Sequence, residues 1–293
     1  MGSPGTATVN RWYRAHARDL PWRSTTPWGV LVSEFMLQQT PVPRVLPYWT
    51  AWMERWPTAT DLAGARPAEV IRAWGTLGYP RRATRLHEAA RTITTAYTRT
   101  ITTAYRGDVP DTYDALRALP GVGDYTANAV LAFAFGQRTT VLDVNVRRVI
   151  ARAWRGEQHP PPHLTTAERA LADSLVPTTP DAASTWAAAS MELGAVICTA
   201  TNPRCTECPL TNTCAWRSHG HPHTTTTRRR QPSYTGSDRQ ERGRILALLR
   251  AHDRLTAAAL AKDAANPEQH VRARDSLLDD GLIARTGRHL HLP

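Results

Sequence analysis

The four cysteines of the sequence lie in one short segment with the spacing C-x6-C-x2-C-x5-C: Cys198, Cys205, Cys208 and Cys214. Thiolates this close together could hold a zinc ion or a [4Fe–4S] cluster, whereas disulfides are disfavoured in a reducing cytosol. Zinc ribbons usually pair two short C-x2-C knuckles, and the sequence has only one such pair. Ligand softness does not separate the two metals. The spacing therefore favours an iron–sulfur cluster over zinc.

A glycine-rich turn opens a helix in the segment 119–127, which reads LPGVGDYTA. Free N–H groups at the start of a helix can hold a phosphate, and Gly121 and Gly123 would let the backbone approach it without a Cβ collision. Two glycines at this spacing also fit an ordinary tight turn. The turn is therefore a candidate phosphate contact, and the other motifs of the sequence decide how strong the evidence for this contact is.

The charge of the chain favours a polyanionic partner. The sequence carries 36 Lys and Arg against 25 Asp and Glu, a formal net charge of +11. A basic surface without a partner is the alternative. No apolar run approaches the ~18 residues of a membrane span, and residues 1–10 lack the layout of a secretory signal. We therefore expect a cytoplasmic, nucleoid-associated protein with no membrane partner.

The elements that position these residues are predicted to be helices. Between about Trp12 and Ala215, apolar residues recur at three- and four-residue spacing, and Asp or Pro marks several helix starts. No alternating run is long enough to indicate a sheet, so the core is predicted to be all-α. The run RTITTAY occurs twice between residues 91 and 106. This tandem repeat predicts one helix lengthened by about two turns, or ~12 Å.

The chain is predicted to divide after the last cysteine. Residues 1–218 would form the helical core with the cysteine loop 198–214, and the polar, arginine-containing segment 219–240 is typical of a flexible basic linker. Helices are expected at 241–250, 256–262 and 268–280, followed by a hairpin pattern at 281–290. Three helices and a hairpin indicate a small winged-helix-like module over 241–293.

Taken together, the motifs resemble the endonuclease III and adenine glycosylase superfamily. The cysteine loop follows a helix ending MELG at 191–194, and two further segments match the family, SEFMLQQT at 33–40 and VLDVNVRRV at 141–149. The resemblance runs from about Arg11 to Trp216. It implies a two-lobed helix-hairpin-helix core, a monomer acting on double-stranded DNA, and a [4Fe–4S] cluster on the four cysteines that supports DNA binding and does not catalyse hydrolysis.

The resemblance assigns catalysis to Glu34, Asp143 and Tyr125. Breaking an N-glycosidic bond builds positive charge on the sugar, which the Asp143 carboxylate would stabilise, although Asp143 alone would be interpreted as a helix cap. Adenine leaves poorly without a proton, and burial of Glu34 in an apolar helix should raise its pKa enough to supply one. A Glu34 paired with an arginine is the alternative. Tyr125 matches the position of the lysine of the lyase-competent branch.

The resemblance also implies contacts to DNA and to the base. Side chains of the segment 18–23 would surround an extruded adenine, and Glu192 would hydrogen-bond it. Gln39 and Tyr79 would wedge into the duplex as the base leaves, and Asn145 and Arg147 would touch the DNA strand. The substrate-binding residues implied in this way are Arg18, Leu20, Trp22, Arg23, Gln39, Tyr79, Gly121, Gly123, Asn145, Arg147 and Glu192.

A lysine is missing where the lyase branch needs one. Lys262 is the single lysine of the sequence, and it lies in the C-terminal segment. Arginine cannot replace a Schiff-base lysine because its guanidinium stays protonated. We therefore expect a monofunctional glycosylase that cuts the glycosidic bond and leaves an abasic site, without lysine-dependent AP lyase activity.

Three residues depart from the family pattern: Asp124 in the hairpin, Val144 after the aspartate and Pro80 after the wedge tyrosine. The residues beyond Tyr234 are too few for the Nudix-like domain that recognises 8-oxoguanine in longer relatives. The resemblance thus implies a short enzyme of base-excision repair that removes adenine mispaired with guanine or 8-oxoguanine. Two alternatives stay open, a thymine or uracil mismatch glycosylase of the same superfamily and an iron–sulfur DNA-binding regulator.

Overall fold

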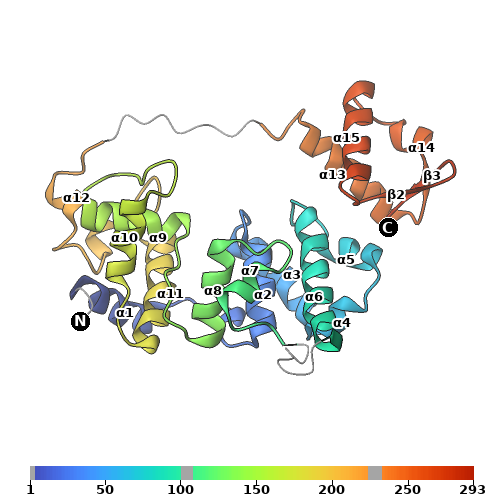
Figure 1. The fold of residues 1–293 in the computed structure, drawn as a ribbon. Coiled ribbons are helices and arrows are strands. Elements are labelled where there is room, and N and C mark those ends of the chain that lie inside the picture. Colours follow the sequence, from blue (N-terminus) through green and yellow to red (C-terminus); the bar gives the residue numbers. More distant parts are fainter. Residues whose placement is uncertain (1–3, 100–107, 224–232) are drawn as a thin grey trace. The chain divides into compact units, whose positions relative to one another are not determined.

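The computed structural model describes residues 4–99, 108–223 and 233–293, and its regular structure is mostly helical (Figure 1). The expected all-α core is confirmed. The second copy of the tandem repeat lies, apart from its first residue, outside the described residues, as does the part of the expected linker at 224–232. Within the described ranges, no helix combines the length and apolarity needed to cross a membrane. The chain forms two compact units.

The first unit is built within residues 4–34, 111–118 and 122–223. Its elements are α1 (Pro4–His16), η1 (Pro21–Arg23), most of α2 (Pro27–Leu37), α7 (Tyr113–Arg117), α8 (Asp124–Phe135), α9 (Val144–Ile150), the π-helical η2 (Ala151–Arg155), α10 (Thr166–Leu175), α11 (Pro180–Val196), η3 (Cys205–Glu207) and α12 (Ala215–Ser218).

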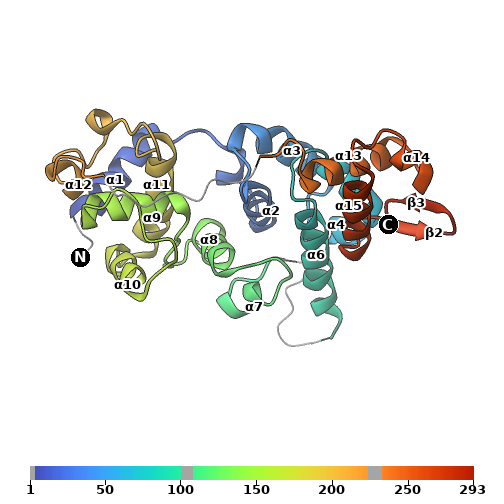
Figure 2. The same cartoon turned by 90° about the horizontal axis from the view of Figure 1, so that it is seen from above.

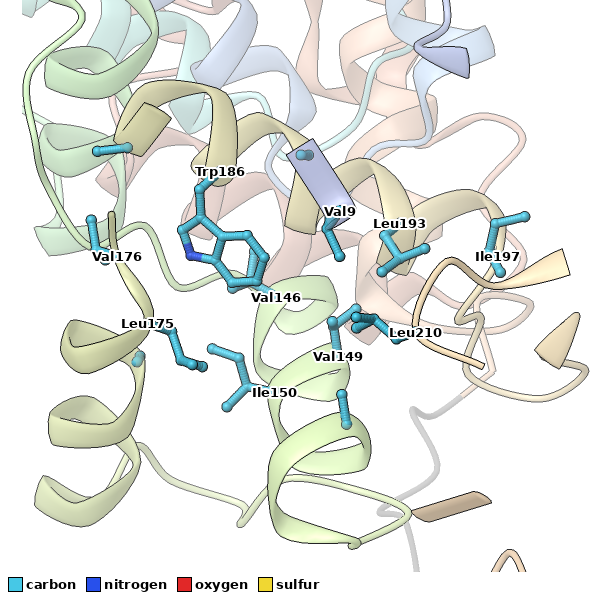
Figure 3. Close-up of a cluster of buried hydrophobic side chains, with 14 residues drawn as sticks. Val9, Val146, Val149, Ile150, Leu175, Val176, Trp186, Leu193, Ile197 and Leu210 are labelled. Carbon is cyan, nitrogen blue, oxygen red and sulfur yellow. The ribbon is translucent and has the colours of Figure 1, made fainter. Parts of the chain in front are cut away.

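Helix α11 is the centre of this unit, packing against α1, α8 and α9. Its Trp186 lies in a buried cluster with Val9 of α1 and with Val149 and Ile150 of α9 (Figure 3). A helix that contacts neighbours on several sides must be apolar nearly all round, and α11 reads PDAASTWAAASMELGAV. Its small residues let α9 approach closely, which matters for the site described below.

The second unit is built within residues 35–99, 108–110, 119–121 and 233–293. Helix α6 packs against α4 and α5; α5 is labelled in Figure 1, and α4 and α6 are labelled in both Figure 1 and Figure 2. The elements are α3 (Val42–Arg55), α4 (Ala59–Ala63), α5 (Pro67–Trp74), α6 (Arg81–Arg99), α13 (Asp238–Ala251), β1 (Leu255–Thr256), α14 (Ala257–Ala261), α15 (Pro267–Asp279), β2 (Ala284–Thr286) and β3 (His289–His291).

The C-terminal segment of the second unit contains the three expected helices and the expected hairpin. Strand β3 lies between β1 and β2 and pairs antiparallel with both, and α13 packs on α15. Leu290 of β3 and Ile245 of α13 are buried in one cluster that also includes Ile71 of α5. Arg250 Nε donates a hydrogen bond to the Ile71 carbonyl at 3.3 Å. The segment therefore has a core of its own, to which α5 contributes Ile71 and the partly buried Ala68.

Candidate active site

Helix α2 carries Glu34 on an almost entirely apolar sequence, PWGVLVSEFML. Every residue from Trp28 to Met36 is buried, and Glu34 is 5% exposed. Burial raises the pKa of Glu34 to about 7, against a hydrogen bond with Tyr125 that lowers it, and the charge of Asp143 adds to the rise. Among the described residues, no arginine acts on this carboxyl. Glu34 is therefore a carboxylic acid that is partly protonated at neutral pH.

Tyr125 lies in the first turn of α8 and shares its hydroxyl with Glu34 in a hydrogen bond. Burial and the charges of Glu34 and Asp143 raise the pKa of Tyr125 well above its ordinary value. The phenol therefore stays neutral at physiological pH and can donate to a carboxylate. Its ring packs on a small apolar cluster that includes Ala129 and Ala187, which fixes the direction of the hydroxyl.

Asp143 is the N-cap of α9. Its Oδ1 accepts the backbone N–H groups of Asn145 and Val146 at 2.9 and 2.7 Å, and its Oδ2 accepts the Asn145 side-chain amide at 2.7 Å. Burial raises the pKa of Asp143, and these hydrogen bonds together with the charge of Arg148 oppose the rise. Asp143 is thus both the helix cap that its sequence context indicates and the neighbour of Glu34.

Arg148 stabilises the position of Asp143 through Asn145, a role that the sequence did not predict. The side chain is 8% exposed. Its NH2 donates to Asn145 Oδ1 and to the Gly194 carbonyl, both at 2.7 Å, and its Nε donates to the Cys198 carbonyl at 2.7 Å. A Cβ on Gly194 would come within 2.7 Å of Asn145 Cβ. Glycine at the end of MELG was the available signal, because it lets α11 approach the residue that orients Asp143.

Arg147 forms an ion pair within the protein that the sequence did not predict. Its Nε and NH2 donate to the two carboxylate oxygens of Glu168 at 2.7 Å, and NH2 also donates to the Pro161 carbonyl at 2.8 Å. The side chain is only 15% exposed. Nε and NH2 are therefore committed within the protein, and a DNA contact by Arg147 stays a prediction. Asn145 likewise uses its amide on Asp143.

The residues expected around the base come together in the first unit. Glu192 on α11 accepts from Arg18 Nε and NH2 at 2.7 Å each and from Arg23 NH2 at 2.8 Å. Burial would raise the pKa of Glu192, but the hydrogen bonds and charges of Arg18 and Arg23 outweigh it and lower the pKa. Leu20 and Trp22 are buried between the two arginines in sequence. Glu192 is therefore an ionised anchor for Arg18 and Arg23.

The hairpin glycines have different surroundings. Gly121 has φ 83° and a Cβ there would come within 2.8 Å of the Phe35 ring, so the position requires glycine. Gly123 is exposed and is the N-cap of α8 without a side-chain cap. Asp124 pairs with Arg169 and accepts from the Tyr113 hydroxyl, both at 2.7 Å. Its charge is therefore balanced within the protein.

The two expected wedge residues lie in the second unit, where both are exposed. Gln39 follows the end of α2, and Tyr79 precedes α6, which begins directly after Pro80. Val144, the other departure from the family pattern, is 70% exposed. Its side chain therefore crowds nothing at the start of α9.

All four cysteines line one small cavity, together with Arg152 of η2 and Trp216 of α12. Burial raises the pKa of Cys208 to about 12, and the neighbouring cysteines add to the rise. Within the described residues, no three His, Cys, Asp or Glu side chains form a ready metal-binding group. The donor set and its convergence on one cavity fit a thiolate-bound metal centre, whose positive charge would stabilise four thiolates.

Residues 32–172 match the HhH-GPD superfamily of base excision DNA repair proteins, a range that holds Glu34, Tyr125 and Asp143. The chain belongs to this superfamily, and the predicted helix-hairpin-helix fold is confirmed.

Individual relatives carry more specific names. The adenine DNA glycosylase of Mycolicibacterium smegmatis is 50% identical over 282 residues, covering 94% of this chain and 91% of the relative. The thymine-DNA glycosylase of Aeropyrum pernix is 36% identical over 209 residues, covering 70% of this chain and 90% of the relative. The solved structure of a thermostable thymine-DNA glycosylase has a TM-score of 0.62 at 28% identity, covering 73% of this chain and 95% of that one.

Proposed function

We propose that the protein is a monofunctional adenine DNA glycosylase of base-excision repair. It hydrolyses the N-glycosidic bond of adenine mispaired with guanine or 8-oxoguanine in duplex DNA. The observation that carries this proposal is the buried Glu34, with a pKa raised to about 7, beside the capped carboxylate of Asp143. The adenine DNA glycosylase that is 50% identical over 94% of the chain supports the same assignment.

In the proposed reaction Glu34 gives its proton to the departing base as the bond between the sugar C1′ and the base nitrogen breaks. The Tyr125 hydroxyl holds Glu34 in place. The negative charge of Asp143 stabilises the positive charge that develops on the sugar. Water then adds to C1′, and the proton that it releases restores Glu34. Arg18 and Arg23, anchored by Glu192, would border the extruded adenine with Leu20 and Trp22.

The second candidate is a thymine mismatch glycosylase, favoured by the likeness to the A. pernix enzyme. A panel of duplexes carrying A:G, A:8-oxoguanine, T:G and U:G pairs separates the two under single-turnover conditions. Release of adenine without thymine or uracil supports the proposal, and the reverse pattern overturns it. Tight duplex binding without release of any base would instead support the other alternative, an iron–sulfur DNA-binding regulator.

We propose that the enzyme lacks lyase chemistry because Lys262, the single lysine, lies at the end of α14 and not in the hairpin segment 119–127. The product strand should stay intact until treated with hot alkali, and borohydride should trap almost no enzyme–DNA adduct. The variant Tyr125→Lys, which places an amine at the hairpin, should gain some trapping. Strong trapping by the wild-type protein would contradict a monofunctional reaction.

The cysteine loop would hold a [4Fe–4S] cluster on Cys198, Cys205, Cys208 and Cys214. When bound, the cluster would stabilise the loop and supply no step of the hydrolysis. Protein prepared without oxygen should contain about four irons per chain and little zinc, whereas stoichiometric zinc without iron would contradict the assignment.

The remaining proposals concern organisation. We propose a glycosylase core over 1–218, a basic linker over 219–240 and a winged-helix-like accessory DNA-binding module over 241–293, in a monomer that acts on DNA in the cytoplasm. The three helices with a three-stranded sheet support the module. The alignment with the M. smegmatis relative, at 94% of the chain, must include most of it.

A further inference from the structure

Two exposed residues that the proposed function places at the DNA have unusual backbone. Gln39 has φ 57° and Tyr79 has φ 48°, and among the described non-glycine residues only His221 shares this left-handed conformation. Gln and Tyr rarely adopt it, because their Cβ approaches the following carbonyl oxygen. Such strain persists only where the surrounding structure holds it in place. Contacts with neighbouring residues must therefore fix the backbone of Gln39 and of Tyr79.

Arg82, in the first turn of α6, fixes the backbone on both sides of Gln39. Its NH1 donates to the Gln38 carbonyl at 2.5 Å and to the carbonyls of residues 35 and 36 at the end of α2, at 2.9 and 3.1 Å. Its NH2 donates to Thr40 Oγ1 at 3.0 Å. The residue before Gln39 and the residue after it are therefore tied to the same planar group.

The same guanidinium fixes Tyr79. Its NH2 donates to the Gly78 carbonyl at 3.1 Å, and its carbon lies 5.2 Å from the centroid of the Tyr79 ring. The Trp74 ring, 5.4 Å from the guanidinium, also donates its Nε1–H to the Gly78 carbonyl at 3.0 Å. Arg82 thus joins the two strained residues through one rigid fork of donors, a geometry that lysine cannot reproduce.

The surroundings of Arg82 are costly for a cation. The residue is 8% exposed, and its Nε has no hydrogen-bond partner among the residues that the structure describes. Its acceptors named above are neutral carbonyl and hydroxyl oxygens, and burial lowers its pKa to about 10. A buried charge without a counter-charge is unfavourable for folding. The hydrogen bonds of Arg82 given above go to residues 35–40 and to Gly78, so they serve the backbone around Gln39 and Tyr79.

We infer that Arg82 is a positioning residue for base extrusion, holding Gln39 and Tyr79 in their inserted geometry before DNA arrives. This inference rests on the proposed function, which supplies the wedge role. Fixing the backbone of the two residues in advance removes the part of the entropy loss that ordering this backbone on insertion would otherwise require. The backbone is held while both side chains remain exposed and free to enter the duplex.

The test measures extrusion separately from chemistry. A mispaired duplex carries 2-aminopurine beside the target adenine, and its fluorescence rise is followed by stopped flow in the Glu34→Gln background. Arg82→Lys keeps the charge but loses the fork, so extrusion should be about tenfold slower, as for one lost hydrogen bond to a charged group. The matched control is Arg91→Lys, an exposed arginine on the same helix, which should extrude at the background rate.

A second pair of variants serves if Arg82→Lys does not fold. Thr40→Val removes one acceptor of the fork without changing its shape, and Thr40→Ser restores the hydroxyl. Extrusion slowed in Thr40→Val and recovered in Thr40→Ser supports the inference. Extrusion at the control rate in both Arg82→Lys and Thr40→Val overturns it. Failure of the proposed function is distinguished by the wild-type protein, which would then release adenine from no mispair.

Discussion

The two carboxyl groups of the candidate site lie in opposite kinds of surroundings. Glu34 lies within an apolar helix and shares a hydrogen bond with one phenol, whereas Asp143 caps a helix and accepts three N–H groups. Burial raises the pKa of both, but the charged form of Glu34 is favoured by the Tyr125 hydroxyl alone, whereas that of Asp143 is favoured by three N–H donors and an arginine. The difference shows how two groups of the same chemistry can become proton donor and anion.

The largest expected effect comes from neutralising each carboxyl in turn. Glu34→Gln removes the proposed proton donor with little change of volume, and adenine release should fall by ~10²–10⁴. Asp143→Asn removes the negative charge that the proposed reaction places at the sugar, and release should fall by ~10²–10³. Single-turnover kinetics measure both, while fluorescence anisotropy should show near wild-type mispair binding. Near wild-type release in both variants would contradict the division of roles.

A smaller effect on the rate of adenine release is expected from removing the hydrogen bonds that position Asp143. Arg148→Met removes the donors to Asn145 and to the Gly194 and Cys198 carbonyls, which should let Asp143 shift. Displacements of about 1 Å can reduce rates by up to ~10², so we expect release to fall between tenfold and about that value. Arg155→Met, an exposed arginine just beyond α9, is the control. If the two variants had equal rates, Arg148 would not position Asp143.

The burial of Glu34 should also affect the free energy of unfolding and its dependence on pH. The pKa of Glu34 rises from 4.5 in the unfolded chain to about 7 in the folded protein, so its favourable contribution is present below pH 4.5 and lost as the pH rises through 7. Gln cannot titrate. Glu34→Gln should therefore be more stable than wild type at pH 8 by up to about 3 kcal/mol, with a smaller gain at pH 5. Denaturant unfolding at both pH values checks this, and no gain at pH 8 would show that Glu34 is not buried as an acid.

The smallest effect concerns the proposed C-terminal module. Truncation would uncover Ile71, so charge removal is the cleaner test. Arg285 and Arg288 are exposed on the hairpin, and replacing both with Gln should flatten the salt dependence of DNA binding by about 0.9 per lost phosphate contact. Arg272→Gln, at an arginine that pairs with Asp238, is the control. An unchanged slope would indicate that the hairpin does not touch DNA.

Much of the site could be predicted from the sequence because its signals are local. The apolar run around Glu34 predicts burial, and an aspartate before a helix predicts the cap at Asp143. The partners of the two adjacent arginines could not be predicted from the sequence. Arg148 binds Asn145, whereas Arg147 binds Glu168. Which of the two side chains points toward α11 depends on how α9 is rotated about its own axis where the two helices pack. The role of Arg82 was missed for a similar reason, since its acceptors come from the end of α2.

The most direct test of the account is the pH dependence of adenine release under single-turnover conditions. In the wild-type protein, Glu34 must be protonated to act, so the rate should fall as pH rises through about 7. In Glu34→Gln the slow residual rate should lack this alkaline decline. A wild-type rate that stays constant to pH 9, or the same decline in both proteins, would contradict Glu34 as the proton donor.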